Sequence, residues 1–398
     1  MRRFRIGSVF GIPLQLDLTF LLVLPLFAYI IGTQVGTWAE TANGLLGANL
    51  DPAVLSVSPL PWILGIAAAV GLFAGVVLHE LGHSLVAMRY GFPIDSITLW
   101  LFGGIAQLTE MPEDWRQELS IAVAGPIVSV VLGALSLAVF LAVPATHSVL
   151  LDSVRFLLSY LALMNLSLAA FNMLPGFPMD GGRVLRALLA RRRSYARATG
   201  IAAEVGKAFA ILLALVGVFL VFNLFLVAIA LFIYIGASSE AQQTTMRAAF
   251  EGIVVADIMT PADRVETVTE DSSVAELIDR MLRDRHTGYP VERDGGIVGL
   301  VTLEDARAVR EVERDAYTVG DVMTTEMVTV APETDVMDAL TDLEGNDIGR
   351  LLVFDGDGSF RGLLTRTDVM TALSIIKTSG RYGERPGERS GGSYDRVS

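Results

Sequence analysis

The sequence predicts a polytopic α-helical membrane domain followed by a soluble α/β region that contains a tandem repeat. Three observations lead to this prediction. Of the 398 residues, 52% are hydrophobic, and the mean hydropathy of +0.53 is too high for an ordinary soluble protein. Up to about Ala237 the chain is apolar and poor in charge, whereas beyond it carboxylates occur every few residues. The acidic half also repeats itself once.

The apolar runs predict six transmembrane helices. A hydrocarbon core of about 30 Å needs roughly 20 apolar residues per helix. The last run is too long for one span, so we expect it to divide near Phe222 and Asn223 into two short helices. The first run lacks a small-residue cleavage site and is interpreted as a retained span, not a signal peptide. The predicted runs are 14–33, 62–88, 119–143, 153–174 and the divided run 203–236.

The basic residues predict the orientation in the membrane, because cytoplasmic loops are enriched in Arg and Lys. Arg2, Arg3 and Arg5 precede the first span, the loop 34–60 has no basic residue, and "RRRSYAR" (191–197) follows the fourth span. We therefore expect the amino terminus and the acidic half to be cytoplasmic.

The charge balance bears on partners and source. The formal net charge is −13, which would repel nucleic-acid phosphates, so we expect no nucleic-acid partner. Arg greatly outnumbers Lys, since only Lys207 and Lys377 occur. An acidic protein with this preference resembles those of halophilic archaea, which predicts the cell membrane of such an organism.

Two histidines lie inside an apolar run, in "GVVLHELGHSLVAMRYG" (75–91). Residues four apart share one face of a helix, so His79 and His83 can present two imidazole nitrogens to one metal ion. A catalytic zinc site takes three protein ligands, and the absence of cysteine leaves His and carboxylate. The best third candidate is Asp180 in "FNMLPGFPMDGGR" (171–183), where Pro and Gly interrupt the helical pattern at membrane depth.

These motifs make residues 1 to about 240 resemble the site-2 protease family of intramembrane zinc metalloproteases. The resemblance rests on "HELGH" and on the later spacing N-x-x-P-x-x-P-x-D-G. It implies one Zn²⁺ per chain, and a single-span membrane protein in the lipid bilayer as the substrate, cut within or near its transmembrane segment. It further implies a membrane-associated extended segment at "LFGGIAQL" (101–108) and a third span that begins at "AGP" (124–126). The residue roles that it implies are zinc ligation by His79, His83 and Asp180, general base catalysis by Glu80, and a polar contact near the reacting carbonyl from Asn172.

The acidic half contains two copies of one unit, at 255–306 and 319–369. Each copy predicts an extended start, an amphipathic helix, two strands around a Gly-containing turn and a second helix. The pair resembles cystathionine-β-synthase-type (CBS) domains, and this implies a regulatory module that binds adenine nucleotide and can form a homodimer. The predicted nucleotide contacts are Thr302, Asp305, Thr365 and Asp368; alternatively, the two aspartates cap their helices.

The predicted domains are therefore 1–240 for the protease, 250–377 for the CBS pair (about 250–310 and 314–377), and 378–398 for a disordered tail. The predicted function is a zinc endopeptidase that cleaves transmembrane segments under control of the CBS pair. The alternatives are a membrane transporter gated by the CBS pair and a non-catalytic pseudoprotease. The transporter would explain the repeats but not the two membrane motifs.

Overall fold

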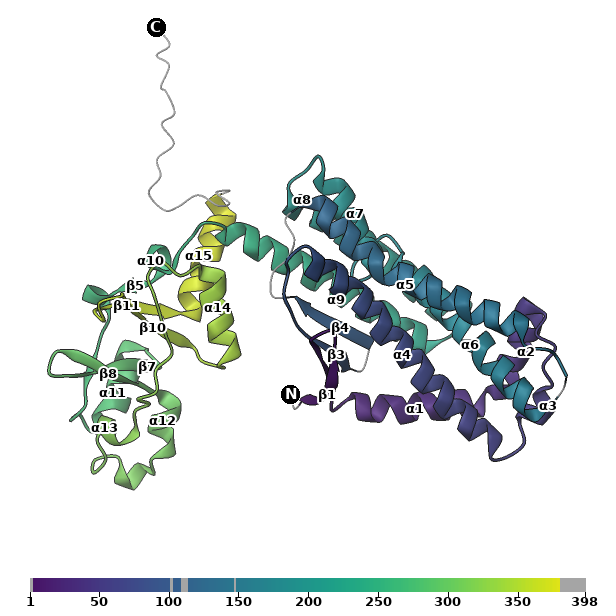
Figure 1. Ribbon diagram of the computed structural model, residues 1–398. Helices are drawn as coiled ribbons and strands as arrows, with labels where there is room; N and C mark the ends of the chain where they lie inside the picture. The colour runs from purple at the N-terminus through teal and green to yellow at the C-terminus, as the bar shows by residue number, and fades with distance from the viewer. Residues whose placement is uncertain (1–2, 101–102, 109–113, 147, 380–398) are drawn as a thin grey trace, which may run out of the picture. The chain divides into compact units, whose positions relative to one another are not determined.

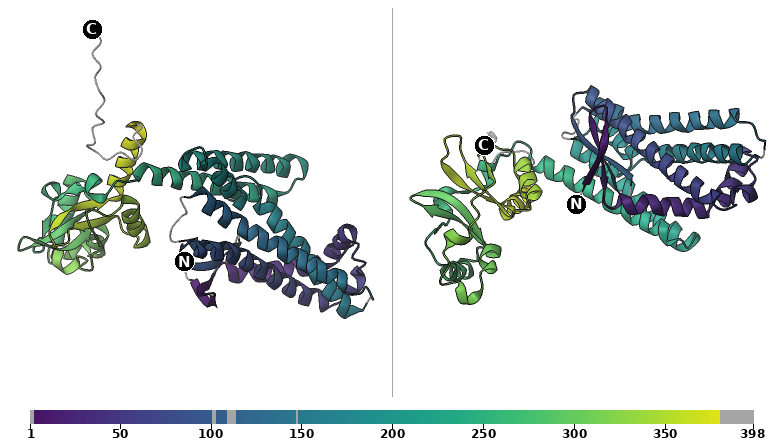
Figure 2. Two further views of the ribbon diagram at one scale, coloured as in Figure 1. Left: turned by 45° about the horizontal axis from the view of Figure 1, so that its top comes forward. Right: turned by 60° about the horizontal axis from the view of Figure 1, so that its bottom comes forward.

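The computed structural model describes residues 3–100, 103–108, 114–146 and 148–379, and it divides the chain into two compact units, Met1–Gln242 and Gln243–Ser398. In unit 1, long helices pack along one another and a small sheet lies at one end of the bundle (Figures 1 and 2). Its helices are α1 (Phe20–Thr33), α2 (Val35–Leu46), α3 (Pro52–Leu55), α4 (Leu60–Arg89), α5 (Trp115–Ala142), α6 (Val149–Asn172), α7 (Asp180–Ala190), α8 (Tyr195–Leu215, extended by a π-helical turn Val216–Leu220) and α9 (Leu224–Phe250).

Within the described residues, five helices are long and apolar enough to cross a membrane, namely α4, α5, α6, α8 with its π-helical turn, and α9. A sixth candidate is α1 with α2, a pair that bends by 68°. The predicted break at Phe222 and Asn223 is correct, because α8 with its π-helical turn ends at Leu220 and α9 begins at Leu224. The two helices are not short, however, since they extend outward to Tyr195 and Phe250 and contain 26 and 27 residues.

The predicted first span, 14–33, is wrong in its first part. Residues Arg3–Val9 and Ile12–Asp17 form the antiparallel strands β1 and β2, and helix α1 begins only at Phe20. The connecting residues Phe10 and Gly11 both have positive φ, 50° and 83°. Positive φ at both central residues is the geometry of a tight two-residue hairpin turn. The segment does alternate, with Ile12, Leu14 and Leu16 on one face of β2 and Pro13, Gln15 and Asp17 on the other, but the apolar content of the run favoured a span over a strand.

The hairpin belongs to a four-stranded sheet with strand order β1-β2-β3-β4. Strand β3 (Ile94–Trp100) lies parallel to β2, and β4 (Gly103–Leu108) lies antiparallel to β3. The predicted extended segment at 101–108 is therefore the edge strand of a larger sheet, apart from residues 101 and 102, which lie outside the described residues.

The "AGP" stretch does not begin the third span. Helix α5 begins at Trp115, with Asp114 as its N-cap, and Pro126 lies inside the helix. Helix α5 packs against α4, α6 and α7, so the AGP residues lie in a helix at the centre of the bundle.

Unit 2 contains two similar α/β halves, as the repeat predicts. Each half's sheet is completed by the segment that precedes the other half: β5 pairs with β11, and Thr324 bridges to Leu300. The sheet orders are β5-β11-β10-β9 and β6-β7-β8. The elements are α10 (Val255–Ile258), β5 (Thr260–Pro261), β6 (Val268–Thr269), α11 (Val274–Asp284), β7 (Gly288–Arg293), β8 (Gly296–Thr302), α12 (Leu303–Ala308), α13 (Val319–Val322), β9 (Thr329–Val330), α14 (Val336–Gly345), β10 (Arg350–Phe354), β11 (Phe360–Thr365) and α15 (Arg366–Ser379).

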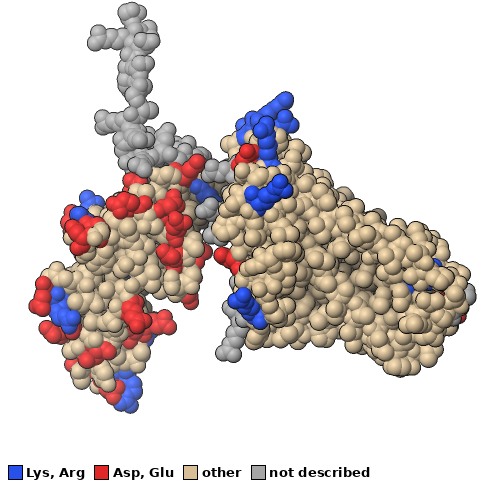
Figure 3. Space-filling view, in the orientation of Figure 1, with Lys and Arg blue, Asp and Glu red and all other residues tan. Residues whose placement is uncertain are grey.

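Acidic side chains are spread over the surface of unit 2, whereas the visible surface of unit 1 is mostly uncharged (Figure 3). Helix α15 runs to Ser379, so the predicted disordered tail does not begin at 378, where the chain is still helical. The remainder of that predicted tail, 380–398, lies outside the described residues.

Candidate metal centre

Helix α4 carries His79 and His83 on one buried face. The two side chains are 3% and 4% exposed, and their Nε2 atoms lie 3.2 Å apart. The four-residue spacing in a regular helix accounts for this approach. The two imidazoles therefore face one point in the structure.

Asp180 reaches the same point from a different part of the chain. Helix α6 ends at Asn172, the backbone turns, and Asp180 is the first residue of α7. Its Oδ2 atom lies 3.1 Å from His79 Nε2 and 3.2 Å from His83 Nε2. Among the described residues, these three form the one cluster of His, Asp or Glu side chains with the spacing of a metal site.

Helix α5 supports both histidines from behind. Ile121, Gly125 and Ser129 follow one another at intervals of four and so share a face of that helix. His83 Nδ1 lies 2.7 Å from the Ile121 carbonyl oxygen, and His79 Nδ1 lies 2.9 Å from Ser129 Oγ. A Cβ atom at Gly125 would lie 2.2 Å from His83 Nε2, so this position admits the histidines only because it is glycine.

The tautomer of His83 follows from its carbonyl contact. A carbonyl oxygen only accepts, so His83 Nδ1 carries the proton and donates it to Ile121. In the neutral imidazole, Nε2 then presents a lone pair toward the carboxylate of Asp180. Two acceptors at 3.2 Å repel each other unless a proton or a metal ion lies between them.

Zn²⁺ fits this donor set. Two imidazole nitrogens and one carboxylate oxygen are a typical combination for catalytic zinc, and ligands about 2.0–2.1 Å from the ion in a tetrahedron lie about 3.3–3.4 Å from one another. The three separations of 3.1–3.2 Å are within a few tenths of that value. The partners of the two Nδ1 atoms are of the kind that orient zinc-bound histidines.

Glu80 lies next to the cluster but does not belong to it. Its side chain is partly buried, and strand β4 passes close by, since a Cβ atom at Gly104 would lie 2.6 Å from Glu80 Cγ. The sheet therefore covers the glutamate from one side. Gly104 of "LFGGIAQL" therefore has a definite role, because a side chain at this position would displace Glu80.

Asn172 closes helix α6 and is partly buried. The structure brings it into no hydrogen bond with His79, His83 or Asp180, all of which are described residues. Its predicted contact with the reacting carbonyl remains a prediction. The supporting contacts from Ile121, Gly125 and Ser129 were not predicted; the interval of four in "IAVAGPIVS" was the available signal.

In unit 2, both predicted Thr–Asp pairs form capping boxes at helix N-termini. Asp305 Oδ2 accepts from the backbone NH and the hydroxyl of Thr302, at 2.8 and 2.7 Å. Thr365 and Asp368 repeat this arrangement with the same two distances. The N-cap residue is the threonine in the first box, so Asp305 occupies the third helical position and is not itself the N-cap.

Thr302 and Asp305 line a cavity of about 420 Å³ in unit 2. The second half of the unit contributes Arg350, whose Nη2 donates to Thr287 Oγ1 at 2.9 Å. Burial lowers the pKa of Arg350, and its buried Nη1 has no hydrogen-bond partner among the described residues.

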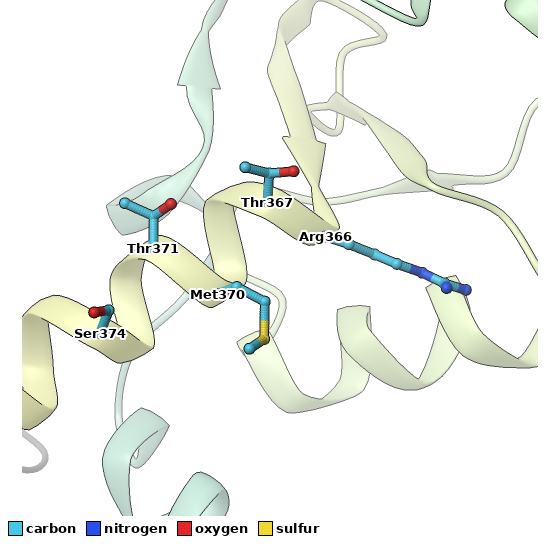
Figure 4. Close-up of a pocket in the computed structure, with 5 residues that line it drawn as sticks. All are labelled: Arg366, Thr367, Met370, Thr371 and Ser374. Carbon is cyan, nitrogen blue, oxygen red and sulfur yellow. The ribbon is translucent and has the colours of Figure 1, made fainter.

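Thr365 and Asp368 do not line this cavity. A second hollow, of about 440 Å³, lies along α15, where Thr367, Thr371 and Ser374 lie on one side of the helix (Figure 4). It is lined by that one helix and includes neither Thr365 nor Asp368. The structure thus distinguishes two pairs that are equivalent in the sequence.

Comparison with known proteins agrees with both parts of the chain. The model of peptidase family M50 matches residues 67–154 and 141–213, and the CBS domain model matches 255–311 and 319–375. The zinc metalloprotease MJ0392 of Methanocaldococcus jannaschii is 35% identical over 373 residues, which are 94% of this chain and 96% of that protein. A solved structure, the site-2 protease from Methanocaldococcus jannaschii, is 36% identical and covers 60% of this chain and 95% of that chain, with a TM-score of 0.42. The chain therefore belongs to peptidase family M50, the site-2 protease family, and is a membrane-embedded zinc metalloendopeptidase with a tandem pair of CBS domains.

Proposed function

We propose that this enzyme cleaves the transmembrane segment of a single-span membrane protein at a zinc ion held by His79, His83 and Asp180, with one ion per chain. The observation that carries the proposal is the convergence of these three side chains within 3.2 Å. Buried ionisable groups in an apolar span are costly, which favours a functional role for them.

The chain's own residues account for the proton transfers of peptide hydrolysis. When bound, zinc would polarise the scissile carbonyl and lower the pKa of a water molecule. Glu80 accepts a proton from the attacking water as its oxygen bonds to the carbonyl carbon. It then donates that proton to the amide nitrogen as the carbon–nitrogen bond breaks, so one carboxylate serves both steps.

The location of the cluster supports a substrate within the membrane. His79 and His83 lie inside α4, a 30-residue apolar helix, and α4 is flanked by α1 and α5. A peptide bond reaches this position only if its own segment enters the bilayer and unwinds, because a helical bond is shielded by its neighbours. A single-span protein meets this requirement with one segment.

The direct test uses purified full-length protein in liposomes together with a single-span test substrate. Glu80→Gln should retain zinc and lose cleavage, while Asp180→Ala should lose zinc as well. Glu204→Gln is the matched control, because Glu204 is exposed and pairs with Lys207 on the same helix, at 2.9 Å. Cleavage by Glu80→Gln at the parent rate would refute the proposed mechanism, and ion flux without cleavage would support a transporter.

We further propose that the cavity lined by Thr302 and Asp305 binds an adenine nucleotide. Its volume of about 420 Å³ lies in the usual range of ligand sites. Arg350 lines the cavity and offers a positive charge to a phosphate, and the second oxygen of Asp305 can accept from ribose hydroxyls. Thr365 and Asp368 are proposed as the equivalent contacts of a weaker second site. Titration of the full-length protein with AMP, ADP, ATP or S-adenosylmethionine tests this; no binding at millimolar ligand would contradict it.

The proposed orientation places the amino terminus and unit 2 in the cytoplasm. Basic side chains gather at the turn between α7 and α8 (Figure 3), where Arg191, Arg192 and Arg193 are exposed.

Nucleotide binding at unit 2 would change the cleavage rate by about 5- to 150-fold, the usual range of allosteric coupling. A homodimer formed through the CBS pair, and the membrane of a halophilic archaeon as the location, are part of the same proposal.

A further inference from the structure

A cluster of three charged side chains, two of them buried and the third partly exposed, includes a residue of helix α7 and is not explained by catalysis. Arg186 on α7 is 1% exposed. Its Nε and Nη2 both lie 2.6 Å from Glu118 Oε1 on α5, and its Nη1 lies 2.6 Å from Glu240 Oε1 on α9. One guanidinium thus joins three helices that are far apart in the sequence.

The same helix α7 begins with Asp180. Arg186 is six residues further along, about 9 Å along the helix axis, and its guanidinium is also held between two aromatic rings. The ring centroids of Phe177 and Tyr195 lie 4.8 and 4.7 Å from the guanidinium carbon. Helix α7 is therefore fixed in both position and rotation at a point less than two turns from the aspartate.

Helix α9 contacts the segment that delivers Asp180 at two further points. A Cβ atom at Gly236 would lie 2.9 Å from Pro178 Cγ, and Ala237 packs in one apolar cluster with Phe177. Gly236, Ala237 and Glu240 lie on one face of α9, since they are one and four residues apart. This face of α9 contacts Phe177 and Pro178, which precede Asp180 in the chain, and Arg186, which follows it.

The composition of the cluster indicates a role beyond general stability. Two carboxylates share one guanidinium, and within the described part of the chain the buried Glu118 Oε2 has no hydrogen-bond partner. A buried ion pair adds little net stability when the cost of desolvation offsets the Coulomb attraction, so stability alone does not explain this cluster. Removal of Glu240 leaves Arg186 paired with Glu118. The contact with α9 is then lost while the positive charge of Arg186 stays compensated.

We propose that Arg186 is a positioning residue for Asp180, and that its ion pair with Glu240 makes the position of this metal ligand depend on helix α9. The proposal rests on the ligand assignment made above. Helix α9 continues to Phe250, and Ala249 and Phe250 lie in the hydrophobic core of the second CBS half. A shift or rotation of α9 therefore changes the metal centre through Glu240 and Arg186.

The test measures the metal site directly, on the full-length protein. Zinc release to a chelator and the visible spectrum of the Co²⁺-loaded protein are recorded for Glu240→Ala, Glu240→Gln and Arg186→Lys. We expect zinc release to be about tenfold faster in Glu240→Ala, the lower end of the effect of outer contacts on metal affinity, with a changed Co²⁺ spectrum. Glu240→Gln, which keeps the shape and one acceptor, should lie between Glu240→Ala and the parent.

Glu204→Gln is the control, because it removes one carboxylate from an ion pair on α8. It should leave both metal readouts unchanged. If Glu240→Ala and Arg186→Lys lower the melting temperature but keep the parent Co²⁺ spectrum and zinc release, the cluster only stabilises the fold and the proposal is wrong. Asp180→Ala tests the ligand assignment separately. If that variant retains the metal, the assignment of Asp180 as a ligand is wrong, and so is the positioning role of Arg186.

Discussion

Gly125→Ala should disable the metal centre by adding a single methyl group. The new Cβ would lie 2.2 Å from His83 Nε2 and 2.7 Å from His79 Nε2, whereas ordinary contact needs about 3.5 Å. The histidines or helix α5 must then move by about 1.3 Å at the closer contact. Zinc sites tolerate deviations of about 0.2 Å in ligand distance, so the displacement is several times larger than the site can absorb.

A misplacement of about 1 Å costs roughly 100-fold in rate, and altered support of zinc ligands costs about 10- to 100-fold in metal affinity. We expect losses of this size in both cleavage of a single-span substrate and retention of zinc against a chelator. Gly133→Ala is the control in the same helix. Its Cβ would lie 2.8 Å from Leu166 Cγ, so it disturbs packing at a similar distance but away from the metal. Parent-like zinc retention in Gly125→Ala would refute the geometry described for α5.

Three further predictions concern other parts of the chain. Ser129→Ala removes the partner of His79 Nδ1 and should weaken zinc binding by about 10- to 100-fold, measured by competition with a chelator. An impermeant thiol reagent applied from outside should label a cysteine at Leu45, which is 68% exposed, but not one at Ser194; the reverse pattern would overturn the orientation. Arg350→Ala should weaken binding of AMP by about tenfold or more, since a hydrogen bond to a charged group contributes about 1.5–3 kcal/mol, and calorimetry that shows unchanged affinity would exclude this cleft as the phosphate site.

The sequence predicted the centre of the site because its residues are chemically out of place. His79 and His83 lie in an apolar run at helical spacing, and Asp180 follows a run of Pro and Gly that cannot continue a helix. Burial of such groups in a membrane is costly enough that few arrangements explain them. The structure brings all three within 3.2 Å of one another.

The residues that hold this centre in place could not be predicted in the same way. Every residue has a backbone carbonyl, so nothing marks that of Ile121 as the partner of His83. Arg186 pairs with residues 68 and 54 positions away, and only the tertiary packing of α5, α7 and α9 brings them together. The hairpin at Arg3–Asp17 was missed because hydropathy over a long window responds to apolar content and not to the two-residue period of a strand.

The short helix α1 has a consequence for the lipid around the enzyme. Its 14 residues extend over about 21 Å, and the chain then bends by 68° into α2, so α1 alone is about 9 Å shorter than a hydrocarbon core of about 30 Å. At its amino-terminal end, Phe20 and Val23 pack with Leu99 of the sheet, and the sheet also covers Glu80. Hydrophobic mismatch of this kind is relieved when the bilayer thins next to the short helix. We therefore expect a thicker membrane to slow the enzyme without a change in any of its residues.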